Sequence, residues 1–136
     1  MPDMATDQAV ATILFVDDDD DLVDALSYAL KHAGYSIRRA SDGDQGVHMA
    51  LLERPDLILM DLMMPVKNGF QACLELWRDE KLRDVPILVL TAFGQSIGEI
   101  HGLRQEQSSG KRLDFLEKPV EVNVLLTRIT RLIGRY

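Results

Sequence analysis

The chain has 136 residues, of which 46% are hydrophobic and 27% are charged, and its formal net charge at pH 7 is −7. This length and composition predict one globular domain with a substantial core. The negative charge disfavours binding to nucleic acid, which needs a basic surface, and docking on anionic membranes. No apolar run is long enough to span a bilayer.

The N-terminal residues 1–11 lack the basic and apolar regions of a secretory signal, so we expect them to form a flexible tail. Cys73 is the only cysteine, which excludes an intrachain disulfide and a cysteine-rich zinc site. These features together favour a reducing, cytoplasmic location.

Short apolar runs alternate with longer segments of helical spacing along the chain. Three runs are solidly apolar (residues 13–16, 57–60 and 87–90), and two weaker ones (35–39 and 114–117) have partial strand character. Continuous apolar strands are typical of a parallel sheet covered on both faces. Strands that alternate with helices predict βαβ units with right-handed crossovers, and therefore an α/β fold.

The first helix should begin near Asp20 or Asp21, either of which could cap it, and should end at Gly34. Three further helices are expected at about 44–53, at about 70–79 and from about 119–121 onward. Their predicted inward residues are Val47, Ala50 and Leu51 in the first of these, Cys73, Leu74 and Trp77 in the second, and Val124, Leu125, Ile129 and Leu132 in the third.

The segment 92–112 is expected to hold a further helix, but its composition is unfavourable. It contains four glycines and only Ile97, Ile100 and Leu103 as apolar anchors. Each glycine inside a helix costs about 1 kcal/mol relative to alanine, so we expect a short, distorted or mobile helix. We find no repeat or linker, and we expect a single domain over 12–136 with this one atypical segment.

Polar side chains stand at the ends of four of the five predicted strands: Asp17 and Asp18, Asp61, Thr91 and Lys118. Ligands of open parallel sheets bind outside the carboxyl ends of the strands. Converging carboxylates repel one another unless a cation neutralises them, and an all-oxygen set suits Mg²⁺. A carboxylate beside Mg²⁺ and a lysine can attack phosphorus, so the set predicts phosphoryl transfer.

The run of aspartates at 17–21 has two interpretations. Acidic residues favour the start of a helix, which explains Asp20 and Asp21. Asp17 and Asp18 directly follow a buried strand, and for them we favour a metal site. Asp19 has no firm role. The three histidines are far apart in sequence, and we assign them to the surface or to packing.

Four motifs, ILFVDDD, PDLILMDLMMPVKNGF, VPILVLTA and DFLEKPV, occur in this order, and over residues 12–134 the chain resembles the receiver domains of two-component response regulators. The resemblance implies a doubly wound, five-stranded parallel sheet of strand order 2-1-3-4-5. It also implies that Asp61 accepts a phosphoryl group from a histidine of a sensor kinase or phosphotransfer protein. Further implied roles are Mg²⁺ binding by Asp18 directly, by Asp17 mostly through water, and by the backbone carbonyl of Met63.

The same resemblance implies that Thr91 is a switch hydroxyl, that Lys118 contacts the phosphoryl group and that Phe115 is a switch aromatic. It also implies a cis peptide bond between Lys118 and Pro119. The loop after Asp61 departs from the family at Val66, where glycine is usual. Bulky Met63 and Phe93 lead to the hypothesis that hydrolysis of the phosphoryl group is slow.

The segment between Thr91 and Lys118 is longer than is usual in the family, which suggests a remodelled partner surface with its helix displaced or partly unwound. We expect a signalling module rather than an enzyme, a monomer or weak dimer, with an unknown downstream protein target. Two alternatives remain open. One is a receiver that is not phosphorylated and acts as a constitutive interaction module. The other is an aspartate-nucleophile phosphohydrolase, which would need a second aspartate where Met63 stands.

Overall fold

The computed structural model describes residues 10–64, 67–92 and 97–134. Five parallel strands form one sheet in the order β2-β1-β3-β4-β5. The strands are β1 (Thr12–Val16), β2 (Ser36–Ala40), β3 (Leu57–Asp61), β4 (Ile87–Thr91) and β5 (Leu113–Glu117). The helices are α2 (Asp20–His32), α3 (Gly43–Leu52), α4 (Gly69–Arg78), α5 (Ile97–Ser108) and α6 (Val122–Ile133). The predicted α/β class and strand order are confirmed.

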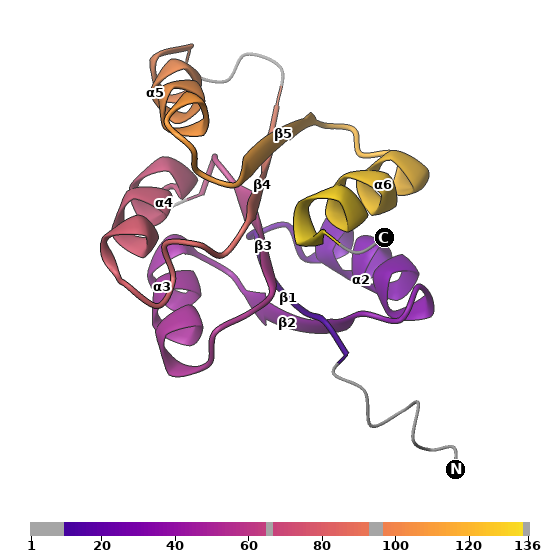
Figure 1. Ribbon diagram of the computed structural model, residues 1–136. Coiled ribbons are helices and arrows are strands. Elements are labelled where there is room, and N and C mark those ends of the chain that lie inside the picture. The colour runs from indigo at the N-terminus through magenta and orange to yellow at the C-terminus, as the bar shows by residue number, and fades with distance from the viewer. Residues whose placement is uncertain (1–9, 65–66, 93–96, 135–136) are drawn as a thin grey trace.

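Helices cover the sheet on both faces, with α2 and α6 on one side and α3, α4 and α5 on the other (Figure 1). Alternate residues of the central strands serve the two cores. Ile13 and Phe15 of β1 pack in the α2/α6 core, whereas Leu14 and Val16 pack in the opposite core. This double burial explains why the central strands are continuously apolar. Within the described part of the chain, no helix has the length and hydropathy of a membrane span.

Helix α2 begins at Asp20, as predicted, but neither Asp20 nor Asp21 caps it. The cap is Asp19, whose Oδ1 accepts a hydrogen bond of 3.1 Å from the backbone N–H of Leu22. In a run of five aspartates any neighbour offers the same chemistry, so the backbone conformation decides which one caps. Gly34, with φ of 102°, follows the helix end as expected.

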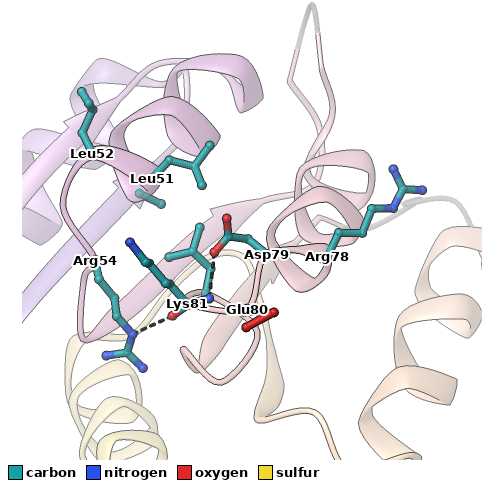
Figure 2. Close-up of a pocket in the computed structure, with 9 residues that line it drawn as sticks. Leu51, Leu52, Arg54, Arg78, Asp79, Glu80 and Lys81 are labelled. Atoms are coloured by element: carbon teal, nitrogen blue, oxygen red, sulfur yellow. Dashed lines mark hydrogen bonds between the residues drawn. The ribbon is translucent and has the colours of Figure 1, made fainter.

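Helix α3 turns small residues toward the sheet, and the prediction that Leu51 faces inward is wrong. Its buried residues are Gly43, Gly46 and Ala50, whereas Leu51 is 52% exposed. A Cβ on Gly46 would lie 2.9 Å from Val16 Cγ2, so glycine allows this close packing. Figure 2 shows Leu51 at a hollow of about 760 Å³ whose lining also includes the end of α4 and the turn that follows it, residues 78–82.

Helices α4 and α6 bury most of the residues expected of them. Cys73 and Trp77 of α4 are buried, as are Leu125 and Ile129 of α6. Val124 is 40% exposed, so its assignment to the buried stripe of α6 is wrong, because it lies at the solvent edge of the first turn.

Helix α5 has 12 residues, so of the short, distorted or mobile helix that was expected, the first alternative is wrong. Its glycines are compensated by packing. Leu103 is fully buried, Ile100 packs against the same core, and Gly102 lies so close to the Phe70 ring of α4 that a Cβ would be 3.2 Å from Cε1. Tertiary contacts thus outweigh the low helix propensity of the segment.

Candidate functional site

The carboxyl ends of the adjacent strands β1 and β3 bring together Asp17, Asp18 and Asp61. Each offers a carboxylate oxygen, and these oxygens all lie within 4.8 Å of one another. Asp17 is 2% exposed and Asp61 is 4% exposed, whereas Asp18 is exposed at the rim. Among the described residues, this is the only group of three or more acidic, histidine or cysteine side chains close enough to share a metal ion.

Lys118 reaches the two buried carboxylates from the end of β5. Its Nζ lies 3.3 Å from Asp17 Oδ2 and 3.4 Å from Asp61 Oδ1. Its backbone N–H donates a 2.7 Å hydrogen bond to the carbonyl of Thr91, which ties the strand end to β4. The Lys118–Pro119 peptide bond is cis, as the resemblance implied. One ammonium thus balances part of the charge of two carboxylates.

The pKa values of Asp61 and Lys118 are both raised, and each of the two groups affects the pKa of the other. Burial, and then the nearby charge of Asp17, raise the pKa of Asp61 from 3.8 to about 6, against the opposing effect of Lys118. Burial alone would lower the pKa of Lys118, but the carboxylates of Asp61 and Asp17 outweigh it, and the pKa is raised. The crevice therefore keeps its lysine charged and carries excess negative charge that a bound cation would relieve.

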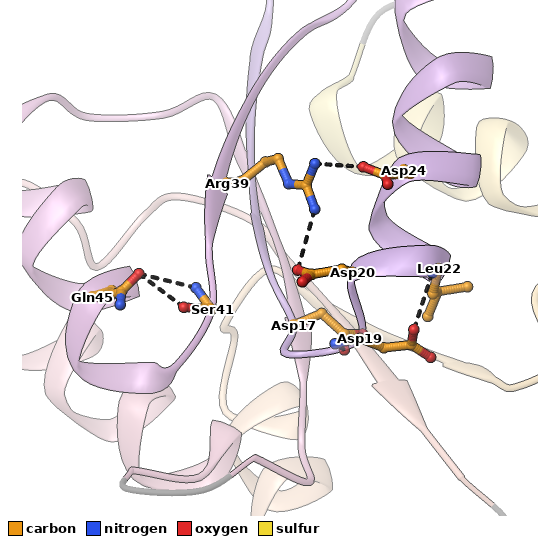
Figure 3. A network of polar contacts seen from close by, with 8 residues as sticks. All are labelled: Asp17, Asp19, Asp20, Leu22, Asp24, Arg39, Ser41 and Gln45. Carbon is orange, nitrogen blue, oxygen red and sulfur yellow. Dashed lines mark hydrogen bonds and ion pairs between the residues drawn. The ribbon is translucent and has the colours of Figure 1, made fainter.

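Asp19 supports the crevice although the sequence assigned it no firm role. Its backbone N–H donates a 2.9 Å hydrogen bond to Asp17 Oδ1, while its side chain caps α2 through Leu22 (Figure 3). Asp17 is thus held at both oxygens, by Asp19 and by Lys118. The sequence signal for this role was an aspartate directly before the predicted helix start. The neighbouring aspartates offered the same signal, so Asp19 could not be singled out.

The remaining charge of the aspartate run is partly neutralised by Arg39 at the end of β2. Its guanidinium lies 2.5 Å from Asp24 Oδ1 and 3.4 Å from Asp20 Oδ1, on the exposed side of α2 (Figure 3). The predicted division of the run is therefore visible in the structure. Asp17 and Asp18 lie in the crevice and Asp20 and Asp21 lie in the first turn of α2, as expected, while Asp19, which had no predicted role, caps the helix.

The loop after Asp61 is held to the end of β3 by a hydrogen bond to the Asp61 carboxylate. Met63 N–H donates to Asp61 Oδ1 at 3.3 Å, and its side chain is 60% exposed. At the other end of the loop, Asn68 caps α4 by accepting from the N–H of Gln71 at 2.9 Å. Val66 lies outside the described residues.

Thr91 and Phe115 lie on the side of the crevice that faces α5. Thr91 is 9% exposed at the end of β4. Phe115 is partly buried, and Arg104 of α5 lies over its ring at 4.7 Å, a contact that spacing did not predict. Phe93 lies outside the described residues. His32, His48 and His101 are exposed and belong to no metal-type cluster in the described part of the chain.

The crevice fits a hard divalent cation. It offers carboxylate oxygens only, at least two of them buried and mutually repulsive, with an open side at Asp18. Mg²⁺ is held in this manner by one or two carboxylates and completes its shell with water and phosphate oxygens. Asp17, Asp18 and Asp61 would hold it, and Lys118 contacts two of these carboxylates.

Comparison with known proteins matches residues 13–130 to the response regulator receiver domain. The chain is 42% identical over 123 residues to the DNA-binding dual master transcriptional regulator RpaA of Synechocystis sp. PCC 6803. It is 36% identical over 125 residues to protein PilH of Pseudomonas aeruginosa. These matches cover 90% and 92% of this chain, but 49% of RpaA and 99% of PilH, so the chain spans about half the length of the first relative.

Solved structures of the same kind superpose closely. The receiver domain of the sensor histidine kinase PA1611 of P. aeruginosa, described with a magnesium ion coordinated in its active site cleft, has a TM-score of 0.78 and 34% identity. That match covers 93% of this chain and 99% of the other. The chemotaxis protein CheY4 of Vibrio cholerae has a TM-score of 0.78 and 29% identity over 91% of this chain and 99% of its own.

Proposed function

This chain belongs to the response regulator receiver domain family, a family of signalling modules rather than enzymes, and from that membership we propose that Asp61 is its phosphoacceptor. The phosphoryl group would come from a phosphohistidine of a sensor histidine kinase or a histidine phosphotransfer protein, with Mg²⁺ in the crevice. The observation that carries the proposal is the convergence of Asp17, Asp18 and Asp61, two of which are in contact with the half-buried Lys118.

The contacts of Asp61 suggest which of its oxygens reacts. Lys118 Nζ and Met63 N–H both approach Oδ1. Oδ2 has no hydrogen bond within the described part of the chain, so we assign it as the attacking atom. It would form the new bond to phosphorus as the bond from phosphorus to the histidine nitrogen breaks, and the histidine takes up a proton.

The other residues would stabilise charge around the transferred group. Mg²⁺, when bound, supplies positive charge to phosphoryl oxygens that would otherwise be repelled by the crevice. The Lys118 ammonium would also bind a phosphoryl oxygen, which its flexible side chain can reach, and would then interact less strongly with the two carboxylates. Thr91 would donate its hydroxyl to another oxygen, and the backbone carbonyl of Met63 would complete the metal ligands.

Attack requires the ionised form of Asp61. With a pKa raised to about 6, the Asp61 carboxylate is mostly ionised at pH 7. A bound cation would lower this pKa and favour the ionised form more strongly. Asp17, held by Asp19 and Lys118, would be fixed in position as a ligand of the metal.

The signal would leave through protein contacts. We propose that the Thr91 hydroxyl and the Phe115 ring respond to the phosphoryl group and alter the surface formed with α5. We also propose one domain over 12–136, a monomer or weak dimer, and a cytoplasmic setting. A receiver that is never phosphorylated would keep the same surface without the chemistry, and the next experiment separates the two.

The test is covalent labelling of the whole chain. The protein is incubated with Mg²⁺ and an acyl phosphate, and its intact mass is followed. We expect one phosphoryl adduct on the wild type, none on Asp61→Asn, and wild-type labelling on Asp24→Asn, which removes an exposed carboxylate of α2. A wild type that forms no adduct in the presence of Mg²⁺ contradicts phosphoacceptor function and supports the constitutive module.

A further inference from the structure

Lys67 connects three elements beside the candidate phosphoacceptor site. It lies in the loop between β3 and α4, and its side chain is only 19% exposed. Its Nζ pairs with Asp44 Oδ1 of α3 at 3.1 Å and also with the Glu75 carboxylate of α4. Contacts with Glu75 and then Asp44 raise the pKa of Lys67, so its ammonium is charged. We name these three residues the Lys67 clasp.

The main chain of Lys67 packs on the same helix that its side chain reaches. A Cβ placed on Gly43, the first residue of α3, would lie only 2.3 Å from the carbonyl oxygen of Lys67. Asp44 follows Gly43 directly. The loop is therefore held against the start of α3 by backbone contact and by an ion pair at once.

Lys67 is separated by one residue, Asn68, from Gly69, which is in direct contact with the end of β3. Gly69 donates its N–H to the carbonyl of Leu62 at 3.1 Å. A Cβ on Gly69 would lie 2.3 Å from the carbonyl oxygen of Asp61. Asn68, between them, caps α4. A shift of Lys67 would therefore pass through the cap residue Asn68 and the tightly packed Gly69 to the backbone of Asp61.

We propose that Lys67 is a positioning residue, whose clasp holds the Asp61–Met63 backbone where Mg²⁺ and the phosphoryl group require it. This inference rests on the phosphoacceptor function proposed above. Small displacements of the groups that orient a reacting atom reduce rates strongly. Outer residues that orient metal ligands have comparable effects on metal affinity.

The proposal is testable because loss of the Lys67 charge and loss of its positioning role would change Mg²⁺ affinity in opposite directions. As a cation near a carboxylate cluster, Lys67 disfavours a second cation, so loss of its charge alone would strengthen Mg²⁺ binding. Loss of its positioning role would weaken Mg²⁺ binding. The direction of the change in Mg²⁺ affinity therefore distinguishes the two roles.

The experiment measures Mg²⁺ dissociation constants and acyl phosphate labelling rates on the whole chain, with binding followed by the amide chemical shifts of Met63 and Gly69. We expect Lys67→Met to weaken Mg²⁺ binding and slow labelling by about tenfold each, the lower end of the loss seen when a residue that orients metal ligands is removed. Lys67→Arg should restore both to within about twofold, because it can pair with both carboxylates. The control Lys81→Met, an exposed lysine that forms no ion pair within the described residues, should leave both unchanged.

Unchanged or tighter Mg²⁺ binding by folded Lys67→Met would overturn the inference while leaving the phosphoacceptor function intact. A wild type that does not bind Mg²⁺ would instead overturn the proposed function, and this inference with it. Far-ultraviolet circular dichroism establishes that each variant is folded. If Lys67→Met is unfolded, Lys67→Gln, which keeps a donor for Glu75 without the charge, is judged by the same direction of change.

Discussion

The acidic crevice and the α5 side of the sheet are held by different forces. In the crevice, buried Asp17 and Asp61 share the ammonium of Lys118. On the α5 side, the Arg104 guanidinium lies over the partly buried Phe115 ring at 4.7 Å. A buried carboxylate that loses its partner costs far more than a partly exposed cation–π contact that is lost.

This difference indicates where the molecule can vary. The crevice is strongly constrained because each buried charge needs its partner in place. Among the described side chains of α5, Leu103 is fully buried and the others are exposed or half-buried, so the outer surface of this helix can vary more freely than the crevice. Phe115 lies between the two regions, since it belongs to β5, which ends directly before Lys118, and its ring lies under Arg104 of α5.

The largest expected effect comes from removing the crevice cation. Lys118→Met should lower the rate of labelling by acyl phosphate at least about 100-fold, because one positioned charge opposite a developing anion contributes on this order. Initial labelling rates at saturating Mg²⁺ measure the effect.

Arg39→Gln is the matched control for Lys118→Met. It also removes a cation paired with two aspartates, but at the exposed start of α2. We expect less than about a twofold change, since exposed ion pairs contribute little. Similar losses in the two variants would mean that the crevice is no more dependent on its cation than the surface is.

The next effect is on stability, and it depends on pH. The folded-state pKa of Asp61, about 6, lies above its ordinary value of 3.8. The folded state therefore binds this proton more tightly, and Asp61 destabilises the fold increasingly as the pH rises from 3.8 to 6 and fully above that. Asp61→Asn should stabilise the metal-free protein by on the order of 2 kcal/mol at pH 7.5, and by less at pH 5.

Urea unfolding at the two pH values, with and without Mg²⁺, measures this gain, which should shrink when Mg²⁺ stabilises the wild type. Asp114→Asn provides the comparison at a partly exposed ion pair outside the crevice, because Asp114 of β5 pairs with Arg128 of α6 at 3.3 Å. It should lose less than about 1 kcal/mol. A loss of stability in Asp61→Asn at pH 7.5 would show that the crevice carries no electrostatic strain.

The crevice was predictable from the sequence because its geometry follows from topology. In a parallel sheet the carboxyl ends of neighbouring strands share one edge, so residues that end the apolar runs at Asp17, Asp61 and Lys118 had to converge. Which acidic residue would cap α2 was not predictable. Asp19 was separated from its neighbours only by its backbone conformation, which depends on the path of the chain leaving β1.

Other features depended on tertiary contacts that have no local signal. Leu51 fitted a helical stripe, but the close approach of Gly46 to Val16 selected a different face of α3. Lys67 was a single lysine in a loop, and its two partners lie on separate helices. The length of helix α5 was underestimated because helix propensity includes the cost of its glycines but not the stabilisation from burying Leu103.

The smallest expected effect tests the α5 side directly. Gly102→Ala should gain about 1 kcal/mol of helix propensity and lose part of it by displacing the Phe70 ring, which a Cβ would approach to 3.2 Å. We expect a net stabilisation of about 0.5 kcal/mol in urea unfolding and an unchanged labelling rate. The same substitution at Gly46 should instead destabilise by about 1–3 kcal/mol, because its Cβ would meet buried Val16 beside the crevice at 2.9 Å. If Gly102→Ala proved as damaging as Gly46→Ala, the α5 side would be packed as strictly as the crevice, and the contrast between the two regions would fail.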